Sequence, residues 1–564
     1  MNLQLKRKLF LLVFGLVVVT LTTSLSLIFV KQKASSNATS SETIFPVANG
    51  QTVTTLDYSG LNIKSVSDIY QTATQTKIAQ EIKQLEASQT YSFDKMLVLA
   101  NPYLTNTTGL YLHFSTTKAT KISYTVKSKG TSTFSQTLYN PNGTYAKNHT
   151  YQLIGLIAGQ ENTITITAMD QNGQKETKTF TYTPNKLRGS DQNQLKVTKG
   201  TSKTKLSSGL YAVIGDKSLK TRNTYLVDNN GYIRAEIPTI NYNSLRLIQT
   251  NNKLYLAVDD DQLVTLDRLG QVVQSYSLKD TNFKLHHDFA VDSQGNIIAL
   301  ATDTKLKASE KRVEDQIIKI DATSGQVSRL LDFKDLLGDL YKTATGIETL
   351  TNNKGYRDVI HANSIQLTKD DQVIISSRET STIMKISNLT SQPKLDYFIS
   401  DPSIWQGIGT YSNLLLNKVG NFTSQAGQHS VTYIPTETAG VYYLEMFNNN
   451  SAIMNSRTNF SWANYPNSGG ATSSNDYQSS YYKYLVNENT GSYQLVKKIS
   501  LPYSPFISSV QTKDNNVVTD SGMTATFAEY DADGKLIQSF ETTDSTKFIY
   551  RVYKYDFNNF YFAN

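Results

Sequence analysis

The sequence contains no cysteine, which excludes structural disulfides, thiolate zinc sites, cysteine nucleophiles and iron–sulfur clusters. Good helix formers are sparse outside one short stretch, whereas Thr, Ser, Asn and Tyr are abundant, with 35 tyrosines in 564 residues. This composition favours β structure. The net charge of +8 is modest for this length and is spread along the chain, which argues against a nucleic-acid partner. A chain this long predicts two or three domains.

The first 33 residues have the pattern of a transmembrane signal-anchor. Lys6, Arg7 and Lys8 precede an uncharged apolar run over residues 9–30, and Lys31 and Lys33 follow it. At about 1.5 Å per residue, a helix over this run would cross a hydrocarbon core of about 30 Å. We therefore expect a single-pass protein of the cell membrane whose remaining chain is extracellular, or a secreted protein if the anchor is cleaved. Residues 34–64, rich in Ser, Thr and Asn, read as a tether.

The segment 65–94 contains apolar residues at helical spacing, which predicts one amphipathic helix. The apolar positions are Val66, Ile69, Ala73, Ile78, Ile82 and Leu85. This helix would pack on the domain that follows or pair with a second copy of the chain, which would give a homodimer.

From residue 95 onward the pattern is that of short strands. Segments such as NTITITAMD alternate apolar and polar residues between Gly and Asn turns over 95–185, which predicts a small β-sandwich. Residues 186–205 are polar and read as a linker. Over 206–564 a hairpin pattern recurs, as in YLVDNNGYI, AVDSQGNII and EYDADGKLI. The interpretation is a mainly β protein with a six-bladed β-propeller after the sandwich, and an array of sandwiches is the alternative.

Four of the six histidines lie in the propeller region, in the segments HHDFAVDSQGN (His286, His287), HANSIQL (His361) and GQHSV (His429). Each of these histidines lies at the start of a predicted strand that leads into a hairpin. Since the innermost strands of different blades start near one central channel, we expect these imidazoles to converge there with Arg378. Such a cluster suits either a metal ion or the transfer of an anionic group through a histidine nucleophile. Arg378 favours group transfer, because a cation beside a metal site is unfavourable. His113 and His149, in the sandwich, are interpreted as structural or surface residues.

The motifs HHD, HANS with a Ser-Ser-Arg ending at Arg378, and GQH, in this order, resemble the bacterial arylsulfate sulfotransferases. The resemblance extends over about residues 65–564. It implies a six-bladed β-propeller after a small β-sandwich, and transfer of a sulfuryl group from a phenolic sulfate ester to another phenol through a sulfated histidine. No nucleotide sulfate donor, cofactor or metal is implied.

The resemblance also implies residue roles. His429 would be the nucleophile, His361 and Arg378 would bind the sulfuryl oxygens, and one of His286 and His287 would act as acid and base. Strand alternation turns only one of that pair inward, and His287 is favoured. Four further residues are candidates for substrate binding: Asn363, Tyr433, Tyr503 and Trp405.

One residue departs from the family pattern, since Asn448 stands where an Asp is expected; Asn suits a turn, so we interpret it as structural. A sulfatase is a second enzymatic hypothesis. The hypothesis of another class is a non-catalytic cell-surface propeller that binds a polymer or a partner protein.

Overall fold

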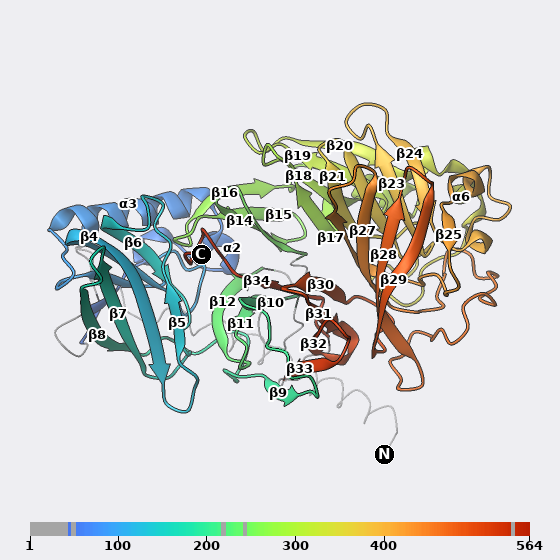
Figure 1. Cartoon of the computed structure of the whole chain (residues 1–564). Helices are drawn as coiled ribbons and strands as arrows, with labels where there is room; N and C mark the ends of the chain where they lie inside the picture. Colours follow the sequence, from blue (N-terminus) through green and yellow to red (C-terminus); the bar gives the residue numbers. More distant parts are fainter. Residues whose placement is uncertain (1–42, 47–51, 216–221, 241–244, 543–547) are drawn as a thin grey trace, which may run out of the picture.

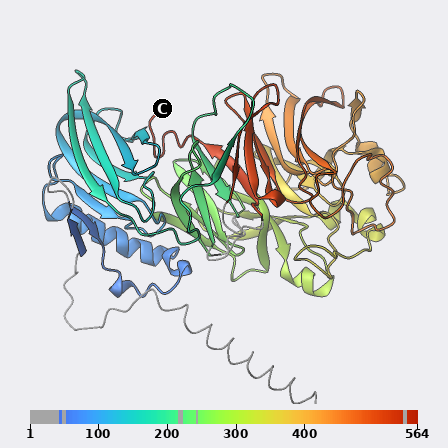
Figure 2. The same cartoon turned by 90° about the horizontal axis from the view of Figure 1, so that it is seen from below.

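The computed structural model describes residues 43–46, 52–215, 222–240, 245–542 and 548–564 (Figure 1). The predicted signal-anchor at 1–33 lies outside these residues. Within the described ranges, no helix combines the length and the apolar character that a membrane crossing requires. The chain forms a β-sandwich and a six-bladed β-propeller that lie side by side, with the C-terminus between them (Figures 1 and 2).

The sandwich is built around one long strand that takes part in both of its layers. The first part of this strand, β4 (Leu110–Ser128), pairs with β3 and β6. Its second part, from Thr120, pairs with β5 and β7. Strand β8 pairs with β7 and forms the edge. Alternate residues of β7 are buried, as expected for a strand with one face on the core. The strands are β1 (Thr43–Pro46), β2 (Thr52–Thr55), β3 (Leu97–Ala100), β4 (Leu110–Ser128), β5 (Phe134–Thr137), β6 (Ala146–Leu153), β7 (Asn162–Asp170) and β8 (Lys175–Tyr182).

Two parts of the predicted N-terminal organisation are wrong. The predicted tether contains β1 and β2, because Val53 and Thr54 pair in parallel with β3 and extend the sandwich sheet. The predicted single helix is divided into α2 (Val66–Ile69) and α3 (Thr72–Ser88), after a short helix η2 (Ser59–Leu61).

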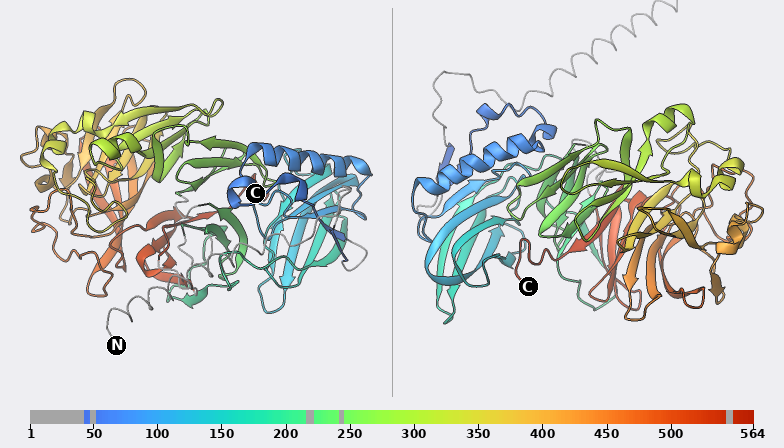
Figure 3. Two further views of the ribbon diagram at one scale, coloured as in Figure 1. Left: turned by 180° about the vertical axis from the view of Figure 1, so that it is seen from behind. Right: turned by 90° about the horizontal axis from the view of Figure 1, so that it is seen from above.

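Helix α3 packs against its own chain, along the sandwich and toward β16 (Figure 3). Ile78 and Ile82 are buried there against Leu97 and Leu99. The buried side chain of Gln75 donates to the carbonyls of Ile69 and Tyr103 and accepts from the Val272 amide. These contacts fix the sandwich to the propeller. Pairing with a second copy stays a prediction.

The propeller contains six sheets, each named here from its innermost strand outward. Blade 1 is β34 (Arg551–Tyr555), β10 (Leu210–Ile214), β11 (Arg222–Val227) and β12 (Ile233–Thr239). Blade 2 is β13 (Leu247–Thr250), β14 (Lys253–Asp259), β15 (Gln262–Leu266) and β16 (Val272–Ser277). Blade 3 is β17 (Phe283–Val291), β18 (Ile297–Asp303), β19 (Gln316–Ile320) and β20 (Val327–Asp332). 

Blade 4 is β21 (Ala362–Lys369), β22 (Gln372–Ser377), β23 (Thr382–Ser387) and β24 (Lys394–Ile399). Blade 5 is β26 (His429–Pro435), β27 (Val441–Asn448), β28 (Gln478–Asn487), β29 (Ser492–Pro502) and β25 (Asn417–Val419). Blade 6 is β30 (Ser509–Lys513), β31 (Asn516–Ser521), β32 (Thr526–Tyr530), β33 (Leu536–Glu541) and β9 (Lys196–Lys199). The connections carry α4 (Thr304–Ser309), α5 (Phe333–Leu336), α6 (Gly338–Thr343), η3 (Pro402–Ile404), η4 (Tyr411–Leu414) and η5 (Gly522–Thr524).

Both ends of the propeller sequence contribute to closing the ring. The C-terminal strand β34 is the innermost strand of blade 1, and β9 is the outermost strand of blade 6. The predicted linker at 186–205 is therefore wrong in part, because it contains a strand whose partner, β33, is more than 300 residues away.

The aspartate of the recurring hairpin motif stabilises the turn between two strands. Its carboxylate accepts hydrogen bonds from two backbone amides inside the turn, as Asp228 does from Asn230 and Tyr232, and Asp531 does from Asp533 and Lys535. The glycine that follows has a φ of 81° at Gly231, a backbone conformation that other residues adopt only with strain.

A buried carboxylate joins the innermost strands of several blades. Asp288, from the HHD motif on β17, has no exposed surface and lies 2.8 Å from Arg551 Nη1 on β34. It also lies 3.3 Å from Arg246 Nη1, just before β13, and accepts from the Ile365 amide on β21. Blades 1, 2, 3 and 4 are therefore tied to one side chain, which includes the strand that closes the ring.

We expect Asp288→Asn to reduce the free energy of unfolding by about 3–5 kcal/mol, because it leaves two arginines without their buried partner. Urea unfolding of the full chain measures this. The control is Asp339→Asn, which breaks an exposed pair with Lys342 and should change stability by less than about 1 kcal/mol. Equal unfolding midpoints for both variants would contradict the assigned role of Asp288.

Candidate functional site

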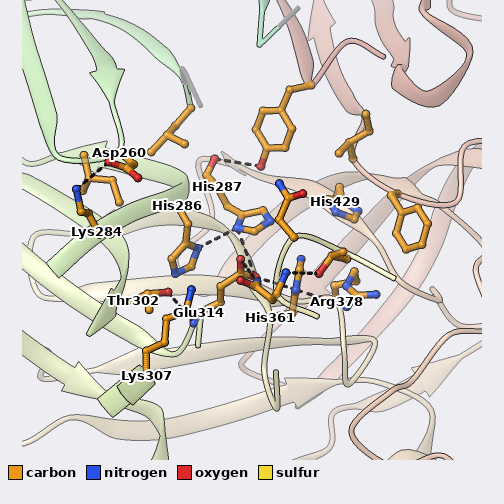
Figure 4. Close-up of a pocket in the computed structure, with 18 of the residues that line it drawn as sticks. Asp260, Lys284, His286, His287, Thr302, Lys307, Glu314, His361, Arg378 and His429 are labelled. Atoms are coloured by element: carbon orange, nitrogen blue, oxygen red, sulfur yellow. Dashed lines mark hydrogen bonds and ion pairs between the residues drawn. The ribbon is translucent and has the colours of Figure 1, made fainter. Parts of the chain in front are cut away.

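A cavity of about 400 Å³ lies where the innermost strands of the blades begin (Figure 4). His286 and His287 come from β17, His361 immediately precedes β21, and His429 is the first residue of β26. Arg378 directly follows β22 and also lines the cavity. The structure therefore brings four histidines and the arginine around one space, from three blades. Further lining residues precede the inner strands of the other blades: Leu245, Phe506, Ile507, Phe548 and Tyr550.

Backbone strain is concentrated around this cavity. Four lining residues other than glycine have positive φ angles: 54° at His287, 48° at His361, 58° at Glu314 and 52° at Ile507. Each such residue costs about 1–3 kcal/mol, and such strain is typical of functional sites. The positive φ of His287 also interrupts the alternation of β17, so both His286 and His287 line the cavity. The prediction that only one of the pair would face it is wrong for this reason.

His429 is held in one tautomer. Its Nδ1 lies 3.0 Å from the Gly427 carbonyl and 2.9 Å from Asn449 Oδ1. The Asn449 amide donates to the carbonyls of Ser504 and Ile507, which fixes its oxygen toward the imidazole. Because both neighbours are acceptors, Nδ1 carries the proton and Nε2 keeps its lone pair. Burial lowers the pKa of His429 to about 3, and nearby His361 and Arg378 act in the same direction. The ring is therefore neutral near pH 7.

His361 differs from His429 in that its ring is positively charged near pH 7. Its Nδ1 lies 2.8 Å from Glu314 Oε2 and in hydrogen-bond contact with Asp358. Burial and the charge of Arg378 act to lower the pKa of His361, but the charges of Asp358 and Glu314 outweigh them and raise it to about 10. His361 is thus an imidazolium near pH 7. Burial would raise the pKa of Glu314, but the charge of His361 holds it well below its usual range.

Arg378 is the second fixed cation of the cavity. Its Nη2 lies 3.1 Å from both Glu348 and Glu379, and its Nε is buried without a hydrogen-bond partner. Burial opposes the charge of Arg378, but the carboxylates of Glu379, Asp358 and Glu348 raise its pKa. A guanidinium in this state has a donor left for the oxygens of a bound anion.

The imidazole rings of His286 and His287 are joined by one hydrogen bond. Their Nδ1 atoms are 2.9 Å apart, so one donates and the other accepts. Burial lowers the pKa of His286 to about 4 and that of His287 well below its usual value, so both rings are neutral near pH 7. The ring of His287 also packs edge-on against His361, with centroids 4.6 Å apart.

Four predicted substrate-binding residues lie outside the cavity lining. Trp405 is fully buried in a hydrophobic core, where its Nε1 donates to Thr382. Tyr503 donates its hydroxyl to the Gly470 carbonyl, and Tyr433 packs on Tyr442 farther along β26. Asn363 is buried and donates to the Gln428 carbonyl. The aromatic residues that do line the cavity are Phe506, Phe548 and Tyr550.

Sequence reasoning missed three side chains that set the charge states of the histidines. Asp358 stands three residues before His361 in the segment DVIHANS, and Asn449 directly follows the Asn448 that departs from the family pattern. Glu314 lies in the connection between α4 and β19, where no periodic pattern marks it. Asn448 accepts from the amides of Ala426 and Asn450, which is the structural role expected for it.

Two groups of residues that include the histidines have the donor atoms and spacing of a metal site: His286, His287 and Glu314, and Glu314, Asp358 and His361. The imidazolium of His361 offers no lone pair, and Arg378 adds a second cation beside it. Both cations are paired with carboxylates, so an anion would bind here through the donors that these pairs leave free, such as Arg378 Nε. A metal-free site stays a prediction.

Comparison with known families gives two matches that together extend over most of the chain. The model Arylsulfotransferase (ASST) matches residues 195–561, and the model Arylsulfotransferase Ig-like domain matches residues 97–185. No curated protein matches the chain.

Solved structures similar to this chain have low sequence identity. A functionally unknown protein from Desulfotomaculum acetoxidans is 9% identical, with a TM-score of 0.34 over 62% of this chain and 99% of its own. Virginiamycin B lyase from Staphylococcus aureus is 11% identical, with a TM-score of 0.29 over 61% of this chain and 87% of its own. Similarities with such low TM-scores do not indicate the function of this chain.

We expect Glu314→Gln to lower the pKa of His361 from about 10 by at least about one unit, since a close carboxylate favours the imidazolium by this amount or more. Because the folded-state pKa is raised, the charge is present at low pH and is lost as the pH rises through that value. Histidine-labelled NMR titration measures the change, and only six histidines need assignment. Glu310→Gln, which alters a carboxylate paired with Arg312 and Lys334, is the control. An unchanged titration of His361 in Glu314→Gln would show that Glu314 does not set its charge.

Proposed function

Since the chain belongs to the arylsulfotransferase (ASST) family, we propose that it moves a sulfuryl group from a phenolic sulfate ester to a phenolic acceptor through a sulfohistidine at His429, without a nucleotide sulfate donor. The family supports arylsulfotransferase activity in general. The observation that carries the finer proposal is the charge pattern of the cavity. A neutral imidazole with a free Nε2 shares it with two cations, the imidazolium of His361 and the guanidinium of Arg378.

In the first half-reaction, the lone pair of His429 Nε2 forms a bond to sulfur and the bond from sulfur to the phenolic oxygen breaks. The phenolate leaves with the electron pair. By analogy with phosphoryl transfer, charge on the sulfuryl oxygens is high in the transition state. His361 and Arg378 would stabilise it, and the cation that forms on the His429 ring would be stabilised at Nδ1 by the Gly427 carbonyl and Asn449.

In the second half-reaction, an acceptor phenol attacks sulfur and His429 leaves as neutral imidazole. His287 would take the phenolic proton, since burial keeps this ring neutral in the resting protein. The nearby carboxylate of Glu314, 3.8 Å from His287 Nδ1, would stabilise the resulting imidazolium. That proton then goes to the phenolate that leaves in the next cycle, so the proton count balances over one turnover.

The outward-facing, membrane-anchored location stays a prediction that rests on residues 1–33. It does not affect the chemistry of the cavity.

Incubation with para-nitrophenyl sulfate should release nitrophenol and add one sulfuryl group to His429. Peptide mass spectrometry under alkaline quench measures this, because a sulfated imidazole is labile in acid. His429→Asn should neither carry the group nor release nitrophenol, and the control His113→Asn, in the sandwich, should retain both. A label on another residue, or none with nitrophenol still released, would contradict the assignment of His429. Turnover that does not rise when a phenol is added would favour a sulfatase.

The rate of the first half-reaction should be nearly independent of pH from about 5 to 9. The nucleophile is active when neutral, and the pKa of His429 is lowered to about 3, so its acid limb lies far below that of an ordinary histidine. The alkaline limb follows His361, whose pKa of about 10 marks the loss of its charge. Rapid-quench kinetics with para-nitrophenyl sulfate measures the profile. An acid limb near the ordinary histidine value of about 6.5 would contradict the charge state assigned to His429.

A further inference from the structure

The cavity has two walls of different character. Leu245, Phe506, Ile507, Phe548 and Tyr550 form an apolar, mainly aromatic wall. The other wall is polar and consists of Lys284, Thr302, Thr304, Lys307 and the segment 351–353. In Figure 4, Lys307 and His429 lie on opposite sides of the group formed by His286, His287 and Glu314. A ligand that reacts at His429 and extends across the cavity would therefore reach the polar wall with its far end.

Among the described residues that line the cavity, Lys307 is the cation without a carboxylate partner. Lys284 Nζ lies 3.0 Å from Asp260 and 2.6 Å from Asp261. Arg378 and His361 are paired with carboxylates, as described above. Lys307 forms no ion pair among the described residues, and its Nζ lies over the ring of Tyr356, 4.5 Å from the centroid.

Local structure holds Lys307 in place. It lies in helix α4, inserted between β18 and β19, and Asp303 caps this helix by accepting from the amides of Lys305 and Leu306. The cation–π contact with Tyr356 positions the ammonium group without neutralising it. A half-buried side chain held in this way loses little further conformational entropy when it binds a ligand.

We propose that Lys307 forms an anion-binding subsite, and that the phenolic acceptor carries a carboxylate on the side of the ring remote from the reacting oxygen. This inference rests on the proposed function. A neutral phenol that covered Lys307 would remove water from an ammonium group and give no charge in return, which is costly. A carboxylate there restores a charged hydrogen bond while the ring lies on the aromatic wall.

Binding measurements test the subsite without any turnover. Isothermal titration of the full chain would compare para-hydroxyphenylacetate with its neutral amide and with cationic tyramine. We expect the carboxylate to bind at least about tenfold more tightly than the amide, as one charged hydrogen bond provides. Lys307→Gln should abolish this difference, and Lys307→Glu should make tyramine the preferred ligand.

Lys305→Gln is the matched control, since Lys305 is an exposed lysine of the same helix and should leave the preference unchanged. Equal affinity of the wild type for the carboxylate and the amide, or a preference that survives in Lys307→Gln, would overturn the subsite. Transfer kinetics form a separate arm. If the preference in binding is present and no sulfuryl group is transferred, the proposed function fails and the subsite stands. If transfer proceeds and Lys307→Gln raises KM equally for all three acceptors, the subsite is overturned and the proposed function stands.

Discussion

The carboxylate of Asp288 joins innermost strands that are far apart in the sequence. It accepts from Arg551, Arg246 and the Ile365 amide, and Arg246 and Arg551 directly follow the cavity-lining residues Leu245 and Tyr550. Arg551 in turn donates to the Asn363 carbonyl, two residues after His361. The strand that closes the ring, β34, is thereby tied to β17 and to the segment next to His361, which carry histidines of the cavity lining. Removing one partner of such a pair is costly because it leaves an uncompensated buried charge.

Two histidines of the cavity, His361 and His429, differ in charge near pH 7. His361 is cationic because two carboxylates face its Nδ1, whereas His429 is neutral because a carbonyl and an amide oxygen face its Nδ1. Both rings are deeply buried, so the difference in pKa comes from their partners. In the proposed mechanism this arrangement separates the nucleophile, His429, from an electrostatic stabiliser, His361. Both charge states depend on the groups that face the Nδ1 atoms, which include Glu314 at His361 and Asn449 at His429.

Backbone strain at the cavity lies at four residues in different local settings. His361 has a left-handed conformation just before β21, and Ile507 has one in the connection that precedes β30. His287 has one at the irregular part of β17, and Glu314 in the connection that precedes β19. The paired strands next to these residues hold the strained conformations in place. Rigid walls of this kind suit the proposed transfer, in which an aromatic ring is held against His429 while charge moves to its oxygen.

The sequence by itself determined the class of the fold and identified the histidines and the arginine that line the cavity. Alternating strands with Asp and Gly turns predicted the sandwich and the propeller, and the motifs HHD, HANS and GQH marked the histidines. His361 and His429 lie at the start of inner strands as expected, whereas His286 and His287 lie within β17. Local patterns contain this information because a turn or a strand depends on near neighbours. Only the tertiary structure decided which groups meet. Glu314 reaches His361 across 47 residues, β9 joins a strand from the other end of the chain, and Trp405 turns into a core instead of the cavity. Protonation states follow from such contacts, since they depend on burial and on partners that no local pattern encodes.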